Sequence, residues 1–188
     1  MKDKKVHSFA DTDEKQLIIR QEEASEVKSR IARSILEALL EWFGIRESRE
    51  EYIRDSADQP FFAAYSQNRP VGFLCLKKTG RATAELAVMG VLPEYHRQGI
   101  GKALFEAARV YAVRSGFLFL QVKTVEMGHY ESYDRTNRFY QSIGFQEFEV
   151  FPGLWDEANP CQIYVMGLGG AAGRTEEQYG DGNGKTDL

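Results

Sequence analysis

Residues 91–104 read Val-Leu-Pro-Glu-Tyr-His-Arg-Gln-Gly-Ile-Gly-Lys-Ala-Leu, and this stretch decides the fold. An apolar strand, Glu85 to Leu92, leads into a loop with two glycines, and an amphipathic helix follows at once. Such a loop leaves several backbone N–H groups unpaired at the positive end of a helix dipole, where they favour a phosphate. Gly99 and Gly101 have no side chain that would keep a phosphate away from the backbone. The stretch therefore predicts a strand–loop–helix unit that binds a phosphate group.

Two common phosphate-binding loops fit this stretch poorly. A nucleoside-triphosphate loop needs a hydroxyl residue after its lysine to hold magnesium, whereas Lys102 is followed by Ala103. It also needs a glycine five residues before Gly101, and none is there. A dinucleotide loop needs a third glycine, where this chain has Leu104, and an acidic residue at the end of the next strand. Residues 121–124, which end that strand, contain no acid.

Two motifs resemble those of the GCN5-related N-acetyltransferases, the GNAT superfamily. Residues 96–101 read His-Arg-Gln-Gly-Ile-Gly and resemble the acyl-CoA loop Gln/Arg-x-x-Gly-x-Gly/Ala, with His96 in place of the usual Gln or Arg. Residues 137–145 read Asn-Arg-Phe-Tyr-Gln-Ser-Ile-Gly-Phe and resemble the family's Phe-Tyr-x-x-x-Gly-Phe helix end. The resemblance extends over roughly residues 17–168.

Hydrophobic periodicity predicts the element order β-α-α-β-β-β-α-β-α-β-β, which is also the order of the GNAT fold. The resemblance implies an α/β (α+β) chain with a mixed, mostly antiparallel central sheet of about seven strands flanked by helices. Apolar residues from Val27 to Trp42 predict one helix that ends at Gly44, and Ser48 to Glu51 predict a capping box that opens the next. The predicted strand 117–124 is apolar enough to be buried on both faces, and a loop is predicted over 151–161.

The predicted domain spans residues 17–168, between a flexible segment over 1–16 and a disordered tail over 169–188 that lacks apolar anchors. The net charge of −4 argues against a nucleic-acid partner, and no apolar run is long enough to span a membrane. Two cysteines make no disulfide framework, so a cytoplasmic location is expected. The histidines are isolated, so no metal site is expected. A homodimer is common in the family, but no sequence feature decides it.

The resemblance implies acetyl-CoA as co-substrate and assigns the site residues. In the family, the strand before the glycine loop diverges from its neighbour, and the pantetheine arm pairs with the exposed backbone. The residues so implied for CoA binding are Met89, Val91, His96, Arg97, Gln98, Gly99, Ile100, Gly101 and Lys102, with Asn137 as a substitute for an asparagine usual nearer the helix start.

Acyl transfer to an amine needs a base and an acid. A primary amine holds its proton to about pH 10, so a base must remove it, and the leaving thiolate needs a proton. Tyr140 occupies the family's position for the acid. Glu85 lies fourteen residues before Gly99, the family spacing of a glutamate base, and Glu126 after the next strand is the rival base. Core packing for Tyr140 and a solvated carboxylate for Glu85 are the structural alternatives.

The acceptor is the least determined part of the prediction. Acidic and aromatic residues gather in segments 125–134 and 151–161, which favours a small cationic amine through charge and cation–π contacts. Solvated loop charges explain the acidic ones equally well. A protein or peptide N-acetyltransferase and a non-catalytic acyl-CoA-binding module remain the alternative functions. The residues concerned are Glu126, Tyr130, Glu131, Tyr133, Asp134, Trp155, Asp156 and Glu157.

Overall fold

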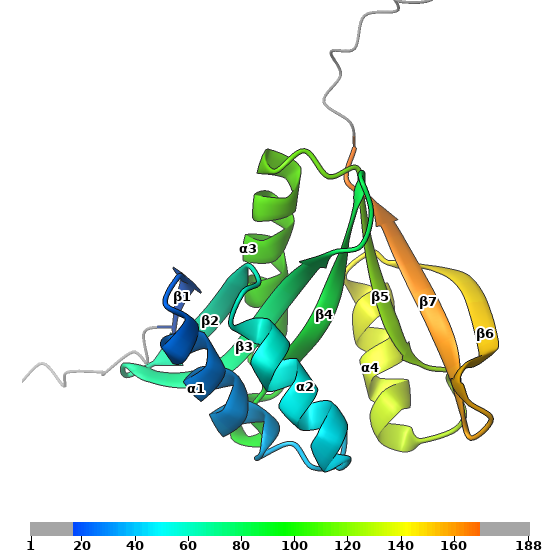
Figure 1. The fold of residues 1–188 in the computed structure, drawn as a ribbon, viewed down its shortest axis with the longest axis horizontal. Helices are drawn as coiled ribbons and strands as arrows, with labels where there is room; N and C mark the ends of the chain where they lie inside the picture. Colours follow the sequence, from blue (N-terminus) through cyan, green and yellow to red (C-terminus); the bar gives the residue numbers. More distant parts are fainter. Residues whose placement is uncertain (1–16, 170–188) are drawn as a thin grey trace, which may run out of the picture.

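The computed structural model describes residues 17–169. The predicted segments over 1–16 and 169–188 lie outside this range, apart from Gly169. The predicted element order is confirmed (Figure 1). The elements are β1 Leu17–Glu22, α1 Ser25–Leu36, α2 Arg46–Ser56, β2 Phe61–Ser66, β3 Arg69–Lys78, β4 Thr83–Val91, a 3₁₀ turn Pro93–Tyr95, α3 Ile100–Arg114, β5 Phe119–Val125, α4 Glu131–Ser142, β6 Gln146–Asp156 and β7 Asn159–Gly167.

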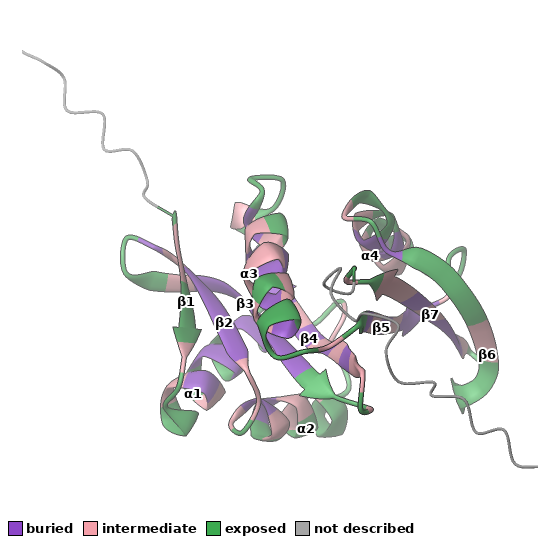
Figure 2. Ribbon diagram, turned by 90° about the horizontal axis from the view of Figure 1, so that it is seen from above, coloured by how far each residue is buried: buried purple, intermediate pink, exposed green. Residues whose placement is uncertain are grey.

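The seven strands form one sheet in the order β1-β2-β3-β4-β5-β7-β6. All neighbouring pairs are antiparallel except β4 and β5, which are parallel because α3 connects them across the sheet. Helices α1 and α2 cover one face and α3 and α4 cover the other (Figures 1 and 2). The predicted fold class, a mixed and mostly antiparallel sheet flanked by helices, is confirmed.

Strands β4 and β5 separate soon after they begin. Their pairing covers only three residue pairs, from Thr83 with Phe119 to Glu85 with Gln121. The register of β4 against β3 also shifts between Leu86 and Val88, at a bulge. Beyond the bulge, the Cβ position of Gly90 points at Leu39 on the α1 side. The sheet therefore opens between two strands at its centre, as the family resemblance predicted.

The first predicted helix is wrong in length. α1 ends at Leu36, and residues 37–45 form turns that connect it to α2. The apolar spacing continued to Trp42 because the connection still packs Leu39 and Trp42 against the core. The predicted capping box is also wrong: α2 begins at Arg46 without a side-chain cap, and Ser48 lies inside its first turn.

Two strand predictions are corrected as well. β6 extends to Asp156, so Pro152 and Trp155 lie in a strand instead of the predicted loop. Proline is tolerated there because β6 is an edge strand, whose outer N–H groups need no partner. β5 is buried on one face only; Phe119 is exposed, and Gln121 and Lys123 are partly exposed. Among the helices, α4 makes the main contact with β5, and it covers only one face of that strand.

Candidate active site

The glycine loop joins β4 to α3 through the 3₁₀ turn. Gly99 is the N-cap of α3 and has φ +79°, a conformation that favours glycine. No side chain caps the helix, so the first-turn N–H groups are left free to face a ligand. A Cβ on Gly101 would lie 3.2 Å from the ring of Phe139 on α4, so this glycine permits close packing of the two helices. The two glycines therefore serve different ends, backbone conformation and packing.

Two of the side chains that were predicted to bind CoA form hydrogen bonds to the backbone of the β4–loop segment itself. His96 Nε2 lies 2.7 Å from the carbonyl oxygen of Val91, and Gln98 Nε2 donates to the Glu94 carbonyl at 3.0 Å. Arg97 and Lys102 make no ion pair among the described residues, and both line the adjacent cavity. The anion-attracting side chains of the loop are therefore Arg97 and Lys102, and His96 and Gln98 hold its shape.

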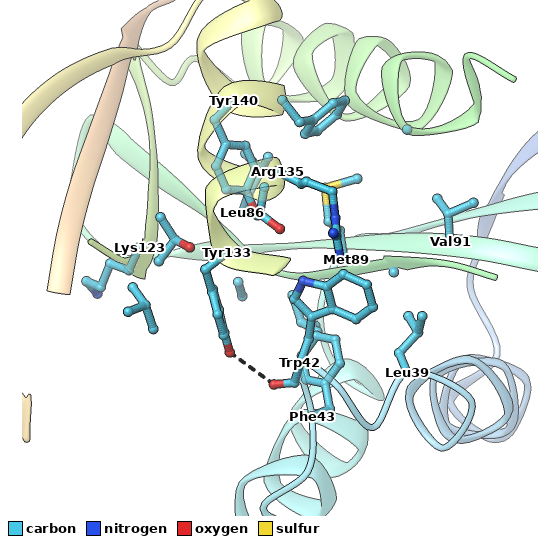
Figure 3. Close-up of a pocket in the computed structure, with 18 of the residues that line it drawn as sticks. Leu39, Trp42, Phe43, Leu86, Met89, Val91, Lys123, Tyr133, Arg135 and Tyr140 are labelled. Carbon is cyan, nitrogen blue, oxygen red and sulfur yellow. Dashed lines mark hydrogen bonds between the residues drawn. The ribbon is translucent and has the colours of Figure 1, made fainter. Parts of the chain in front are cut away.

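A cavity of about 1130 Å³ begins at this loop and extends through the opening between β4 and β5. Its walls include Leu86 to Val91 of β4, Lys123 to Val125 of β5, the α1–α2 connection, and the tip of the β6–β7 hairpin. The cavity thus connects the α3–α4 face of the sheet with the α1–α2 face. Figure 3 shows Tyr133 and Tyr140 from α4 and Trp42 from the α1–α2 connection at this space.

Tyr140 lines the cavity and is only 6% exposed. Burial raises the pKa of its phenol, and the neighbouring Tyr133 and Tyr52 add a smaller increase. The phenol is protonated at neutral pH, as an unshifted phenol also is, and the raised pKa makes it a weaker acid. It can therefore protonate a leaving thiolate only from a close and well-aligned position. Its ring also packs against Phe139, Phe145 and Tyr164, so the packing alternative is present in the structure, and the acid role stays a prediction.

The two candidate bases differ in their surroundings. Glu85 Oε2 accepts hydrogen bonds from Lys123 Nζ at 2.8 Å and Gln121 Nε2 at 2.9 Å, and its side chain is 13% exposed. Glu126 lies 3.4 Å from His129 Nε2, and neither of these two lines the cavity. Glu85 does not line it either, but its partner Lys123 does. Glu85 is therefore the candidate base with a direct side-chain link to the cavity wall.

Asn137 has a structural role that sequence reasoning missed. It is fully buried and does not line the cavity. Its Nδ2 donates to the Val125 carbonyl at 2.9 Å and to the Tyr133 carbonyl at 2.8 Å, which ties α4 to the end of β5. The predicted contact with CoA is corrected, because a side chain with no exposed surface cannot meet a ligand in this arrangement.

The acceptor end of the cavity also differs from the prediction. Of the eight acidic and aromatic residues predicted there, only Tyr133, Trp155 and Asp156 line the cavity. The missing walls come from the α1–α2 connection and α2, whose apolar spacing had indicated core packing alone. The lining residues of this region that sequence reasoning missed are Trp42, Phe43, Ile45, Ser48, Arg49 and Tyr52.

A metal-ligand cluster and a membrane-spanning helix are both absent from the part of the chain that the structure describes. No group of three or more potential metal ligands gathers there. No helix of that part is both long and apolar enough to cross a membrane.

Residues 57–147 match the family model of the acetyltransferase (GNAT) domain. This range begins before β2 and ends in β6, so it includes the glycine loop, Glu85 and Tyr140. No curated protein matches the sequence.

Solved structures with the same fold have low sequence identity to this chain. A GNAT acetyltransferase from Elizabethkingia anophelis with acetyl-CoA bound is 18% identical, with a TM-score of 0.63 over 80% of this chain and 97% of that one. The ribosomal-protein-S18-alanine N-acetyltransferase of Escherichia coli is 18% identical, with a TM-score of 0.66 over 85% and 97%. The aminoglycoside 6'-N-acetyltransferase of Enterococcus faecium is 18% identical, with a TM-score of 0.64 over 80% and 97%.

At such identity these likenesses show the fold alone, and the family assignment comes from the domain model together with the two motifs. The chain belongs to the GNAT superfamily of acetyltransferases.

Proposed function

We propose that this protein transfers the acetyl group of acetyl-CoA directly to a primary amine. One observation carries the proposal: a single cavity leads from the uncapped start of α3, through the opening between β4 and β5, to the buried phenol of Tyr140. A phosphate-bearing thioester and an amine can meet there from opposite faces of the sheet.

The residues present fit CoA. The free amides of the α3 first turn favour the pyrophosphate, and three lining cations without ion-pair partners among residues 17–169 add to this: Arg97, Lys102 and Arg138. The backbone of β4 from Met89 to Val91 no longer pairs with β5, so it offers hydrogen-bonding groups to an extended pantetheine arm. The acetyltransferase from E. anophelis was crystallised with acetyl-CoA on the same fold.

The acceptor must lose a proton before it can react, because a primary amine is protonated at neutral pH. Glu85 takes this proton, through Lys123 or water, and Glu126 is the alternative base. When bound, acetyl-CoA supplies a thioester carbonyl that the free amine nitrogen attacks, forming a C–N bond as the C–S bond breaks. Tyr140 gives its proton to the departing sulfur, and the proton that the new amide nitrogen loses restores the phenol. No covalent bond to the protein is formed, because both Cys75 and Cys161 are buried and burial raises the pKa of their thiols.

Three functions are distinguished by their acceptor: a small amine, a peptide, or none. The acidic and aromatic segments favoured a small cationic amine, but most of their members lie outside the cavity. A peptide acceptor is the alternative, and the fold accommodates both classes, as the E. coli and E. faecium enzymes show by their names. A non-catalytic acyl-CoA-binding module would need neither Tyr140 nor Glu85.

Calorimetric titration with acetyl-CoA tests the cofactor site, and thiol release during incubation with amines, amino acids and peptides tests transfer. We expect binding of acetyl-CoA and acceptor-dependent thiol release that stops when the acceptor is omitted. Binding of acetyl-CoA with no thiol release for any acceptor class would mean that the protein is a binding module and not an enzyme. Absence of acetyl-CoA binding would overturn the proposal entirely.

A further inference from the structure

The charges that line the cavity are almost all positive. One carboxylate, Asp156, lines it. Both oxygens of Asp156 accept hydrogen bonds within the β6–β7 turn, from the Ala158 N–H at 2.9 Å and from Asn159 Nδ2 at 2.9 and 3.0 Å. The lining cations are Arg49, Arg97, Lys102, Lys123, Arg135 and Arg138.

These cations fall into two groups by position. Arg97 lies in the glycine loop, Lys102 in α3 and Arg138 in α4, on the face where the pyrophosphate is proposed. Arg49 lies on α2, across the sheet from α3 (Figure 2). Glu85, the partner of Lys123, is also on the α2 side. It stands opposite Lys77 in the β3–β4 register, and Lys77 contacts Asp55 of α2 at 3.6 Å. The phosphates of CoA therefore do not account for Arg49.

The other two cations outside the cofactor group already have carboxylate partners. Lys123 pairs with Glu85 at 2.8 Å. Arg135 pairs with Glu131 at 3.0 Å and with Glu41 at 3.1 Å. Each of these charges is compensated within the protein.

Among the lining cations outside the cofactor group, Arg49 is the one with no such partner in the described part of the chain. No carboxylate of residues 17–169 lies within ion-pair distance of it, and the adjacent Glu50 is held by Arg33 through two bonds of 2.7 Å. Arg49 Nη1 donates to the Phe43 carbonyl at 2.7 Å, which fixes the guanidinium, while its Nε is buried without a partner. A cation in the first turn of α2 is also disfavoured by the helix dipole. Arg49 therefore lowers the stability of the fold, and a residue that does so without a structural benefit is typical of a functional position.

We propose that the acceptor amine also carries a carboxylate, and that Arg49 binds it. This inference rests on the proposed function and specifies its substrate class: an amino acid or a short peptide with a free carboxyl end. Arginine suits the task because its planar fork binds carboxylate oxygens in pairs. The apolar lining residues Phe43, Ile45 and Trp155 fit the apolar side chain of such an acceptor. The inference reverses the sequence-based preference for a purely cationic acceptor.

The test uses matched pairs of acceptors. Apolar amino acids and dipeptides, each beside its C-terminal amide, are titrated into the CoA-saturated protein and then assayed for transfer from acetyl-CoA. We expect the free acids to exceed their amides by about 10- to 100-fold in affinity and in kcat/KM, the range of a charge-assisted hydrogen-bonded pair. Arg49→Gln should abolish this difference, and Arg49→Lys should restore part of it, with the KM for acetyl-CoA unchanged in both.

Arg46→Gln is the matched control, because Arg46 also lies in the first turn of α2 but is exposed and does not line the cavity. It should keep the full preference for acids. Equal use of acids and amides, or a preference that survives Arg49→Gln, would overturn the inference while leaving acetyl transfer standing. Preference for acids in binding but no transfer to any of them would overturn the proposed function instead.

Discussion

The two ends of the cavity are built in different ways. The proposed cofactor end is formed mainly by one continuous segment, β4, the glycine loop and α3, which presents free backbone amides at the start of the helix. The acceptor end is assembled from three separate parts of the chain: the α1–α2 connection with α2, the start of α4, and the β6–β7 hairpin. Contacts such as Tyr133 Oη to the Trp42 carbonyl at 3.1 Å and Arg135 to Glu41 at 3.1 Å join the first two. A continuous motif fixes one end, and long-range contacts fix the other.

Tyr140 lies between the two ends, and its removal should give the largest effect. Tyr140→Phe keeps the buried ring and removes the proton donor, so kcat should fall about 100-fold, as is usual for loss of a general acid. Affinity for CoA, measured by calorimetry, should stay within about twofold because the phenol contributes nothing to pyrophosphate binding.

Tyr164→Phe is the control for this change, because Tyr164 is also buried, packs against Tyr140 with ring centroids 6.3 Å apart, and does not line the cavity. It should leave kcat unchanged. A Tyr140→Phe variant as active as the parent would mean that the phenol only packs, and the proton would have to come from elsewhere.

The cofactor end could be predicted from sequence because its determinants are local. The φ of +79° at Gly99 and the helix that follows it are both consequences of neighbouring residues, and residues 96–101 carried the signal. The strand order followed from the same unit together with hydrophobic periodicity. Local patterns failed where tertiary packing decided the outcome: Trp42 kept helical spacing after α1 had ended, because its side chain still had core to pack against.

The acceptor end could not be predicted, and the reason is again physical. Apart from Asp156, the acidic side chains in segments 125–134 and 151–161 are adjacent in sequence to the cavity wall but do not line the cavity; Glu126, for example, pairs with His129. Arg49 gave no motif, because its significance comes from the absence of a partner once the chain is folded. Asn137 had the residue type of a ligand contact, but its side chain is buried between α4 and the end of β5.

Two glycines with similar backbone conformations allow the contribution of the glycine loop to acetyl-CoA binding to be separated from its contribution to stability. Gly99 has φ +79° and Gly116 has φ +81°, and a Cβ at either position meets no atom within 4 Å. Alanine at each site should therefore cost roughly 1–2 kcal/mol of stability through the left-handed backbone alone. Only Gly99→Ala should also weaken acetyl-CoA binding, by about tenfold, because relief of the strain rotates the amides that face the phosphates.

Thermal unfolding and calorimetry of both variants separate the two effects. Gly116→Ala reports the backbone cost without the ligand, since Gly116 follows α3 at its opposite end. Equal weakening of acetyl-CoA binding in the two variants would show that general destabilisation, and not the loop conformation, governs affinity.

The smallest effect is expected from the loss of one hydrogen bond at the acceptor end. Tyr133→Phe removes the bond to the Trp42 carbonyl, which joins α4 to the α1–α2 connection across the cavity (Figure 3). Burial raises the pKa of Tyr133 above its ordinary value of about 10, so this hydrogen bond persists above the neutral range as well. Its loss should cost about 1 kcal/mol of stability. It should also raise the acceptor KM roughly threefold with no change in the KM for acetyl-CoA, because only the walls of the acceptor end lose a contact.

Tyr130→Phe is the matched control, since Tyr130 lies beside Tyr133 with ring centroids 5.9 Å apart, is 45% exposed and does not line the cavity. It should change neither constant. If Tyr133→Phe raised both KM values alike, the cavity would respond as one unit and the distinction between its two ends would fail. A selective change would instead mean that the α1–α2 connection adjusts independently of the glycine loop. Acceptor specificity could then diverge among chains that keep the same CoA loop, because long-range contacts change without disturbing a local motif.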